Sequence, residues 1–430
     1  MALTRTRLVQ RAGSAATVVE ADIAVIGAGI AGLSAALEAA RLGRRVALVD
    51  GAPMLGGQAV GAIIGTFCGL FSNGPNPYQV THGIADDILR ELGAEGALHY
   101  IRGRRNTTIV QYDEVALSRW VARAVERSGI DILLGAILRE VARDGGRIRA
   151  LTLATRYGDV ELRAQGFVDA TGDAALAWLA GFPCQEPDEP IYGTQMMVLE
   201  GIDEAALAAI DRKALERRLA EKADAYGLRR HDGFVFAAPG KGRCLINMTH
   251  LETPLEPVAA SRMVLDGHDQ ADRLVGFLKD EYPRAFASAR IRNYGLPGIR
   301  MTRWIVGREH LTTDMVREGV RTADAIARCS WPIELHNRAA GVHWEEFGDD
   351  HMHFVPLGCL IPKGADNLLA AGRCIDGEPA ALSTVRVMGP CIATGAAAAH
   401  ALDLAGAGAV GQIDISALQR RISDNLDRTD

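Results

Sequence analysis

Three glycines and one aspartate close to the N-terminus have the types and spacing of a dinucleotide site. Gly27, Gly29 and Gly32 follow the G-x-G-x-x-G pattern with Ala28 between the first two, and Asp50 ends the next apolar run. In such a unit the first glycine makes a tight turn, the second lets backbone amides approach a pyrophosphate, and the third lets helix and strand pack closely. The acid lies at the distance where ribose hydroxyls are received. The sequence therefore predicts nucleotide binding at this turn.

Two other glycine-bearing segments are candidates for contact with the same ligand. Residues 51–77 mix glycines with apolar residues, which is typical of backbone that lies against a flat ligand, although an ordinary glycine-rich loop has a similar composition. A second glycine turn follows the apolar run 368–371, far away along the chain. The candidate residues of these two segments are Gly56, Gly57, Gln58, Gly372, Arg373 and Asp376.

Histidines and arginines in the second half of the chain are candidates for proton transfer and anion binding. Imidazole titrates near neutral pH and can give or take a proton, while guanidinium groups bind carboxylates. The candidates are His336 and His353 for proton transfer, and Arg300, Arg303 and Arg386 for a carboxylate. A structural hydrogen bond is the alternative for either histidine, and a surface ion pair is the alternative for each arginine. His351 and His353 would share one face of a strand, but no clear third and fourth ligands accompany them, so no metal site is predicted.

The elements around these residues indicate an α/β fold. Two apolar runs, 23–26 and 46–49, read as buried strands on either side of a helix over 33–42, which is a βαβ arrangement. Periodicity and turn residues predict helices over 78–92 and 114–128, strands over 130–134, 137–142, 147–154, 160–162 and 166–172, and a C-terminal helix over 391–404. Pro390 is expected at the first position of that last helix, where its missing N–H does no harm.

Composition limits the class of protein. The net charge is −6 without a basic block, which argues against nucleic acid as a partner, and no apolar run approaches the ~20 residues that a membrane span needs. The seven scattered cysteines have no metal-ligand spacing and predict buried thiols in a reducing, cytoplasmic compartment. Met1–Val19 contains arginines but no apolar core, so we expect a flexible leader there and not a secretory signal.

A chain of 430 residues exceeds the usual size of one core, and the middle of this chain differs from both ends. We predict a nucleotide-binding domain in two parts, residues 1–183 and 355–430, with a substrate domain inserted over 184–354. The insert is more charged, with helices expected over 205–225 and 259–279 and a strand over 242–249.

Several segments resemble the FAD-dependent oxidoreductase family, part of the larger glutathione-reductase/fumarate-reductase-like flavoprotein superfamily. The resemblance is carried by GAGIAGLSAALEAARLGRRVALVD, GGQAVG, YDEVALSRWVARAVERSGIDILL and FVDATGDAALAWLAG near the N-terminus. It resumes in GIRMTRWIVGREHLTTDMVREGVRTADAIARCSWPIELH and in VPLGCLIPKGADNLLAAGRCIDGEPAALSTVRVMGPCIATGAAAAHA. At Glu334, within IELH, the family usually has Asp.

The resemblance implies a Rossmann-like, three-layer FAD-binding domain with a parallel sheet and a β-meander, plus the α+β insert. FAD would fill the first site without a covalent bond, because GGQAVG lacks the histidine that related proteins use for attachment. The family places the strand at Ile137 and Leu138 against adenine, Gly172 and Asp173 near the pyrophosphate, and the helix that begins near Gly389 at the flavin. It also places His336, in IELH, close to the domain boundary.

The favoured function is an FAD-dependent oxidoreductase, a dehydrogenase or reductase that exchanges hydride between flavin N5 and a small polar metabolite, a class that includes carboxylates. The chain shows no second nucleotide-binding βαβ unit and no redox-active cysteine pair, which argues against a pyridine-nucleotide disulfide reductase. Two alternatives stay open: a flavin-carrying electron-relay subunit of a larger complex, and a non-catalytic protein with the same fold. The sequence leaves the electron acceptor, the substrate and the oligomeric state open.

Overall fold

The computed structural model describes residues 16–103 and 106–429. Most of the predicted leader lies outside these ranges. Its last residues, 17–19, do not belong to a leader, because they begin the first strand, β1 (Thr17–Ile26), and pair with Val160–Leu162.

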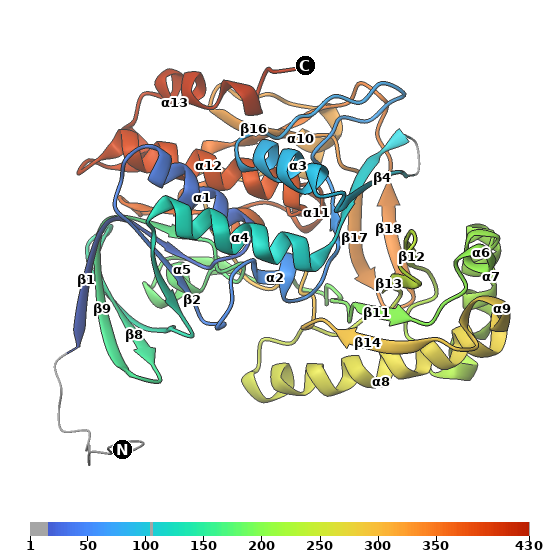
Figure 1. The fold of residues 1–430 in the computed structure, drawn as a ribbon. Helices are drawn as coiled ribbons and strands as arrows, with labels where there is room; N and C mark the ends of the chain where they lie inside the picture. The colour runs from blue at the N-terminus through green and yellow to red at the C-terminus, as the bar shows by residue number, and fades with distance from the viewer. Residues whose placement is uncertain (1–15, 104–105, 430) are drawn as a thin grey trace, which may run out of the picture.

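A seven-stranded sheet organises the described chain, with β6, β2, β1, β9, β8 and β7 in order and β20 beside β9 (Figure 1). Its other strands are β2 (Val46–Asp50), β6 (Asp131–Leu134), β7 (Ile137–Asp144), β8 (Arg147–Thr155), β9 (Gly158–Asp169) and β20 (Leu368–Ala370). The pairs β1–β2, β2–β6, β1–β9 and β9–β20 are parallel, whereas β7, β8 and β9 form an antiparallel meander. The predicted α/β fold with a parallel sheet and a β-meander is confirmed.

One long strand replaces two predicted ones. Residues 160–162 and 166–169 both belong to β9, whose first half pairs with β8 and whose second half pairs with β20. Gly166 sits where a Cβ would come within 2.8 Å of Leu402, so the glycine lets the C-terminal helix lie close to the sheet. The continuous strand therefore joins the meander to the parallel part of the sheet.

Four helices pack near this sheet: α1 (Ile30–Arg41), α3 (Ile84–Ala94), α4 (Glu114–Ser128) and α12 (Met388–Ala405). The pair α1 and α12 is very close, since a Cβ at Gly395 would lie 2.1 Å from Ala31 O. The predicted helix over 78–92 begins only at Ile84, because residues 71 and 79 form a β-bridge and Gly83 has a φ of +82°. Pro390 is the third helical residue and not the first, because α12 begins at Met388.

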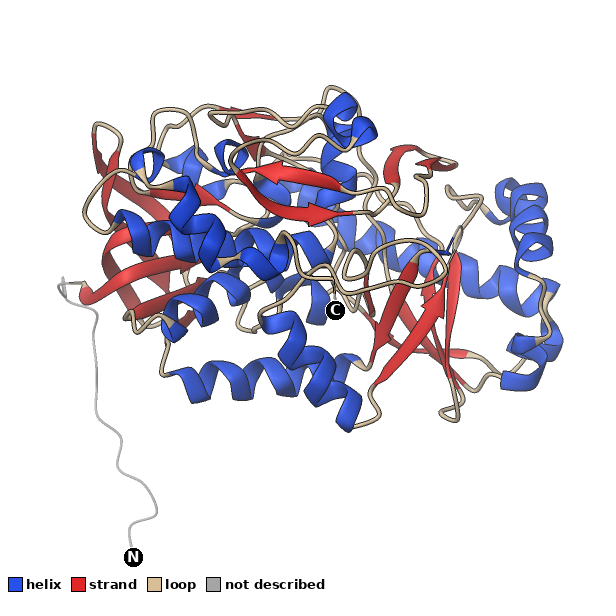
Figure 2. Ribbon diagram, turned by 90° about the horizontal axis from the view of Figure 1, so that it is seen from above, coloured by secondary structure: helices blue, strands red, loops and turns tan. Residues whose placement is uncertain are grey.

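A four-stranded antiparallel sheet forms the centre of the insert, in the order β12, β13, β11, β14. These strands are β11 (Met197–Glu200), β12 (Phe234–Ala238), β13 (Arg243–Asn247) and β14 (Arg290–Tyr294), with helices α6 (Glu204–Ala208), α7 (Arg212–Lys222), α8 (Pro257–Glu281) and α9 (Pro283–Phe286). The single helix expected over 205–225 is broken, because the side chain of Asp211 caps a new helix start. α6, α7 and α9 lie at the end of the molecule opposite β1 (Figures 1 and 2).

The two faces of the insert sheet follow the two-residue period of strands. Met197, Leu199, Cys244 and Ile246 pack into a core with α8. On the other face Val198, Phe236 and Leu245 form a small cluster with Ile63, which comes from the N-terminal part of the chain. That second face is therefore turned toward the nucleotide-binding fold.

Short elements connect these parts. Three small sheets consist of β10 (Cys184–Gln185) with β15 (Trp304–Ile305), β16 (Ala325–Cys329) with β19 (His353–Pro356), and β17 (Ile333–Arg338) with β18 (Gly341–Glu345). A further sheet joins β3 (Thr66–Phe67), β5 (Thr108–Tyr112) and β4 (Leu98–Arg102). The short helices are α2 (Gly57–Val60), α5 (Ala175–Leu179), α10 (Thr313–Glu318), α11 (Pro379–Val385) and α13 (Ile415–Arg421).

The two main hydrophobic cores divide the described chain at positions different from the boundaries predicted from composition. The large core contains buried residues from Ala21 to Ile191 and from Met301 to Leu426, while the insert core is drawn from Met197 to Ala289. The segment from 301 to 354 thus packs with the nucleotide-binding fold, although the predicted boundaries place it in the insert. The boundaries at 183 and 354 stay a prediction.

No single helix among the described residues has the length and apolar composition to cross a membrane. The bent pair α11 and α12, at 87° to each other, reaches these limits only when the two helices are combined.

Candidate active site

The first glycine turn is held by close backbone packing. Gly27 has a φ of +107°, and a Cβ on it would lie 2.2 Å from Ala170 O, while a Cβ on Gly32 would lie 1.8 Å from Gly27 O. Gly29 differs, because a Cβ there would meet nothing within 4 Å. It is the N-cap of α1, so the free N–H groups of that helix face open space.

The carboxylate of Asp50 shapes the same turn. One oxygen accepts from Ala28 N and the other from Ala52 N, both at 2.7 Å. An ionised carboxylate offers about four acceptor sites, so these two bonds leave room for ribose hydroxyls. Asp50 thus both fixes the loop and borders the cavity described below.

The GGQAVG segment lies directly against this turn. Gly56 N donates to Ala28 O at 2.9 Å, and a Cβ on Gly57 would come within 2.6 Å of the Gly29 Cα. Gln58 extends toward the segment that follows β14, since its Oε1 accepts from Ile299 N at 2.9 Å. This segment connects the nucleotide turn to the chain that returns from the insert.

A second set of residues comes from the ends of β9 and β20. Gly172 has a φ of +77°, and a Cβ there would lie 2.6 Å from Arg373 Nε. Arg373 pairs with Asp173 at 3.0 Å, yet its Nη1 is buried without a hydrogen-bond partner. A buried guanidinium donor without a partner is costly, so this position suits an acceptor group of a ligand.

The start of α12 closes the far side. Gly389 N donates to Cys68 O at 3.0 Å, and a Cβ on Gly389 would lie 2.0 Å from Gly69 O, so the helix start is pressed onto the chain that follows β3. Cys391 N is satisfied by Val387 O at 3.1 Å, and Pro390 has no N–H. Met388, the first residue of the helix, borders the cavity.

These segments surround one cavity of about 430 Å³, within the usual range for cofactor sites. Predicted site residues that line it are Gly27, Gly29, Asp50, Gly57, Gln58, Gly172, Asp173, Arg300, Gly372, Arg373 and Arg386. Predicted residues that do not line it are Ala28, Gly32, Gly56, Ile137, Leu138, Asp376, Gly389, His336, Arg303 and His353. Ala28, Gly32, Gly56 and Gly389 hold the lining residues in place through the contacts above.

Two of the remaining residues, Asp376 and Arg303, have other partners. Asp376 is buried and bonds to Gln185, His310 and the amide of Gly307. Arg303 pairs with Glu186 at 3.1 Å and lies 4.3 Å from the ring centre of Trp178, so its side chain is engaged away from the cavity.

The two histidines 351 and 353 do not share a strand face as expected. Only His353 belongs to β19, and its Nδ1 lies 3.3 Å from His351 Nε2. Burial lowers the pKa of His353 to about 3. Among the described residues no group of three or more His, Cys, Asp or Glu side chains is arranged to hold a metal ion.

A chain of hydrogen bonds begins at the cavity and runs into the protein behind it. Glu334 lines the cavity, and its Oε1 lies 3.1 Å from Nε2 of His336, which is fully buried. His336 Nδ1 lies 2.9 Å from His250 Nε2, and His250 Nδ1 lies 2.8 Å from Ala339 O. The predicted candidate His336 is therefore one step removed from the cavity, and Glu334 is the group that faces it.

The hydrogen-bond chain needs one more proton than two neutral imidazoles supply. A backbone carbonyl only accepts, so His250 Nδ1 donates to Ala339 O. Burial lowers the pKa of His250 to about 2, so the ring is neutral and its Nε2 accepts from His336 Nδ1. The remaining Nε2 of a neutral His336 is an acceptor, and it faces a carboxylate oxygen. The Glu334–His336 contact therefore needs an additional proton.

The electrostatic surroundings disfavour a positive charge on His336. Burial, followed by the charges of Arg300 and Arg230, lowers the pKa of His336 well below its usual value. A neutral imidazole at His336 is thus favoured. The other oxygen, Oε2, accepts from Trp331 Nε1 at 3.0 Å. This arrangement places a carboxyl group at the cavity wall with an imidazole directly behind it.

Two guanidinium groups, of the buried Arg300 and the half-buried Arg386, border the same end of the cavity. Arg300 Nη1 donates to Tyr192 O at 2.8 Å, and Arg386 Nη2 donates to Glu334 O at 3.1 Å. Burial lowers the pKa of Arg300 well below its usual value, with the charge of Arg230 adding to the effect. Burial also lowers the pKa of Arg386. A negative group between them would relieve their mutual repulsion, so this end of the cavity suits an anion.

Several residues at the Arg300 end of the cavity were not among the site residues predicted from the sequence. Glu334, Asn247, Thr194, Thr66 and Cys68 all line the cavity, and His250 completes the hydrogen-bond chain. Thr194 Oγ1 donates to Asn247 Oδ1 at 3.1 Å. Glu334 could have been selected from the sequence, since it lies two residues from the candidate His336 in IELH. For Asn247, the alternation of β13 was visible, but nothing in the sequence indicates which face of that strand meets the cavity. His250 lies beyond the end of β13, and nothing in the sequence pairs it with His336.

A family model for FAD dependent oxidoreductases matches residues 22–422 of the 430. The chain belongs to the FAD dependent oxidoreductase family. It is therefore an enzyme with FAD as its cofactor, as the resemblance of its motifs implied. The open space at Gly29, the carboxylate of Asp50 and the unpartnered Nη1 of Arg373 fit such a cofactor.

The remaining comparisons add the following. No match was found among curated proteins. Solved structures include a geranylgeranyl bacteriochlorophyll reductase-like protein from Thermoplasma acidophilum, which is 11% identical with a TM-score of 0.47, with 90% of this chain and 78% of that chain covered. They also include the flavin-dependent brominase Bmp2, at 12% identity and a TM-score of 0.46, with 94% of this chain and 83% of that chain covered. A third is p-nitrophenol 4-monooxygenase PnpA from Pseudomonas putida, at 11% identity and a TM-score of 0.45, with 96% and 85% covered.

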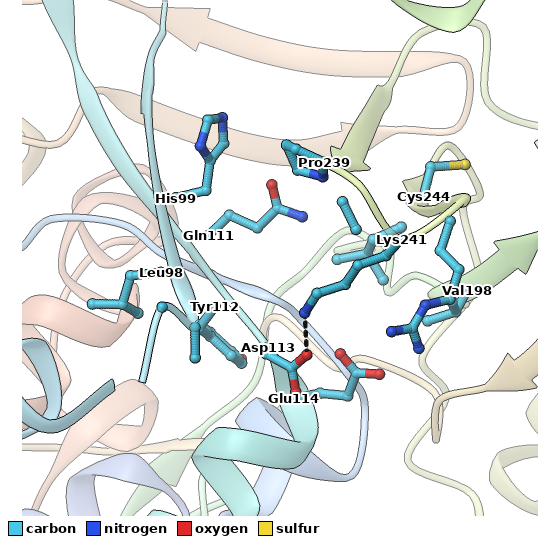
Figure 3. A pocket seen from close by; sticks show the side chains of 15 residues that line it. Leu98, His99, Gln111, Tyr112, Asp113, Glu114, Val198, Pro239, Lys241 and Cys244 are labelled. Atoms are coloured by element: carbon cyan, nitrogen blue, oxygen red, sulfur yellow. Dashed lines mark hydrogen bonds and ion pairs between the residues drawn. The ribbon is translucent and has the colours of Figure 1, made fainter. Parts of the chain in front are cut away.

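A separate cavity of about 200 Å³ lies between the start of α4 and the turn that joins β12 to β13 (Figure 3). Lys241 Nζ reaches across it to Asp113 Oδ2 at 2.8 Å, and Gln111 Oε1 is buried there without a partner. This cavity shares no lining residue with the larger one. It marks a junction between the insert and the nucleotide-binding fold.

Proposed function

We propose that this enzyme is a dehydrogenase or reductase that acts on a small polar metabolite, with carboxylates as the favoured class. When bound, FAD supplies hydride exchange at flavin N5. The observation that supports the proposal is the Glu334–His336–His250 chain, which ends at the cavity that the dinucleotide loops also line. Acid–base chemistry and cofactor binding would thus share one enclosed space.

The residues proposed to hold FAD lie along the nucleotide-binding side of the cavity. The N–H groups at Gly29 suit the pyrophosphate, Asp50 the ribose hydroxyls, and Arg373 an acceptor of the cofactor. Gly172 and Asp173 border the same space. Ile137, which is largely exposed, lies beside the loop after Asp50, because a Cβ on Gly51 would come within 3.1 Å of it. The adenine contact at Ile137 and Leu138 stays a prediction.

The proposed substrate end has three kinds of polar groups. Arg300 would bind the carboxylate through N–H groups that its bond to Tyr192 O leaves over, because a guanidinium has five donors. Glu334 would give or take the proton that accompanies hydride transfer, and His336 with His250 would hold its carboxyl in place and share that proton. Arg386 would stabilise negative charge near the start of α12.

Anaerobic reduction of the purified enzyme tests this function. We expect a yellow protein that releases FAD on mild denaturation, because no covalent attachment residue is predicted. A panel of hydroxy acids, amino acids and neutral alcohols would then be mixed with it without oxygen. Bleaching of the flavin by a carboxylate-bearing compound supports the proposal. Reduction only through a partner protein, with no response to any small molecule, would instead favour an electron-relay subunit.

A further inference from the structure

A third cavity, with aromatic walls, adjoins the proposed substrate end. It measures about 140 Å³, and its apolar lining includes Phe234, Phe236, Trp331, Trp344 and Val342. Thr66, Cys68, Asn247 and Glu334 line both this cavity and the 430 Å³ one, so the two spaces meet at these four residues. Glu334, the group that faces the substrate in the proposed function, stands at the boundary.

The geometry of the walls suits a flat ring. The rings of Phe234 and Phe236 are 5.8 Å apart and nearly parallel, at 5°, because the two residues alternate along β12 on the same face. Trp331 and Trp344 meet at 79° with their centres 6.0 Å apart. Aromatic partners in offset or edge-to-face positions favour another aromatic ring.

The register of the insert sheet places the aromatic wall next to the proposed substrate end. Phe234 on β12 lies opposite Asn247 on β13, and directly opposed residues of an antiparallel pair point to the same face. Asn247 also lines the larger cavity, so the aromatic wall continues without a break into the substrate end. A ligand held against Phe234 would therefore place its next atoms beside Asn247 and Glu334.

Size and polarity narrow the class of ligand. An engineered apolar cavity of about 150 Å³ binds benzene, so a space of this volume has room for one six-membered ring. The indole Nε1 of Trp344 is buried without a partner, and an acceptor atom on the ring would satisfy it. The charged residues that border the cavity have both signs, and the Arg212 guanidinium lies 4.1 Å from the ring centre of Phe234. Besides Glu334, they are Arg102, Arg212, Glu216 and Asp232.

We propose that the substrate carries a flat six-membered ring, seated among Phe234, Phe236 and Trp344, with its carboxylate-bearing part beside Arg300 and Glu334. This inference rests on the proposed function and specifies the substrate class of that site. The reacting carbon would then lie between ring and carboxylate, at the junction of the two cavities.

Ligand binding without turnover tests the proposal. The FAD-containing protein is titrated with benzoate, acetate and benzyl alcohol, and binding is followed by changes in the visible flavin spectrum. Benzoate should bind roughly tenfold or more tightly than acetate, since it adds a buried ring to the same charge. Benzyl alcohol, a ring without charge, reports on the aromatic cavity alone. Equal binding of benzoate and acetate would overturn the proposal.

Two matched variants locate the ring. Val342→Phe fills the aromatic cavity and should abolish the preference for benzoate and the binding of benzyl alcohol, with acetate binding unchanged. Val115→Phe adds the same group at an exposed residue of α4 and should bind all three probes like the unmodified enzyme. A preference that persists in Val342→Phe places the ring elsewhere and contradicts the proposal. Benzyl alcohol binding without any carboxylate binding would support the ring site while contradicting the carboxylate part of the proposed function.

Discussion

In the proposed proton transfer, Glu334 and His336 have different roles. The carboxyl group borders the cavity, while the imidazole is fully buried behind it and is positioned by His250. Two further hydrogen bonds hold Glu334: Trp331 Nε1 donates to its carboxyl Oε2, and its backbone N–H donates to Ser383 Oγ. A proton held at a fixed position is what a general acid or base needs.

Removing this proton site should slow chemistry and leave cofactor binding intact. Glu334→Gln and His336→Ala are each expected to keep near-normal FAD content and to lower the rate of substrate-driven flavin reduction by roughly 10²–10⁴-fold, the usual contribution of a positioned acid–base group. Stopped-flow absorbance measures the rate. His343→Ala, at a partly exposed residue of β18, is the control and should reduce normally. An unchanged rate in both site variants would move the acid–base role to another residue.

Arg300 is expected to contribute to binding more than to chemistry. Arg300→Ala should raise the substrate concentration needed for half-maximal flavin reduction with little change in the limiting rate, if the guanidinium holds ground state and transition state alike. Arg303→Ala is a matched control, because Arg303 is engaged with Glu186 and Trp178 away from the cavity. A large fall in the limiting rate of Arg300→Ala would show that this arginine acts mainly in the transition state.

The lowered pKa of His353 predicts how the free energy of unfolding depends on pH. Its pKa is lowered to about 3 by burial, so the unfolded chain binds a proton here at mildly acidic pH and the folded chain does not. Stability from this residue is complete above the unfolded pKa of about 6.5 and falls as the pH drops below it, by about 1.4 kcal/mol between pH 7.5 and 5.5. Urea unfolding at both pH values measures the loss. His353→Gln should show a loss smaller by about that amount, and an equal loss in both proteins would contradict the assignment.

At the scale of elements, local patterns were sufficient for the nucleotide-binding unit. β1, α1 and β2 were predictable because buried strands, glycines and an acid follow one another within thirty or so residues. The helix α3 was misplaced at its start because β-bridging and the positive φ of Gly83 depend on tertiary contacts. Asn247 was missed for a related reason: the register of β12 against β13 decides which face meets the cavity. His250 lies beyond the end of β13 and meets His336 only through the tertiary fold.

The glycine turn allows a test that separates folding from cofactor binding. Gly29→Val adds a side chain that meets no protein atom near its Cβ, so the fold should persist while the pyrophosphate position is filled and FAD is lost. Asp50→Ala should weaken FAD by about 1–3 kcal/mol, the usual value of a hydrogen bond to a charged group. FAD content and circular dichroism are the measurements. A Gly29→Val protein that retains FAD would show that the pyrophosphate lies elsewhere.

At the scale of the whole molecule, the two sheets have different roles. The parallel sheet brings Gly27, Asp50, Gly172 and Gly372 to one cavity, although these residues are scattered along the chain. The insert sheet is antiparallel throughout its pairings. It closes that cavity from the other side with Asn247 of β13, together with Thr194, which lies just before β11. Substrate recognition would therefore depend on the insert, and cofactor binding on the larger fold.

This division predicts that NADH and NADPH are poor direct reductants. A nicotinamide dinucleotide is usually held by a parallel βαβ unit with a glycine turn, and the antiparallel insert sheet has a different topology. Rapid mixing of the anaerobic enzyme with micromolar NADH or NADPH should leave the flavin oxidised on the timescale at which the true substrate bleaches it. Dithionite provides the control, because it should reduce the same sample fully. Fast bleaching by either nucleotide would show that the cavity admits nicotinamide directly beside the insert, and the substrate end would then have to accommodate two different reductants in turn.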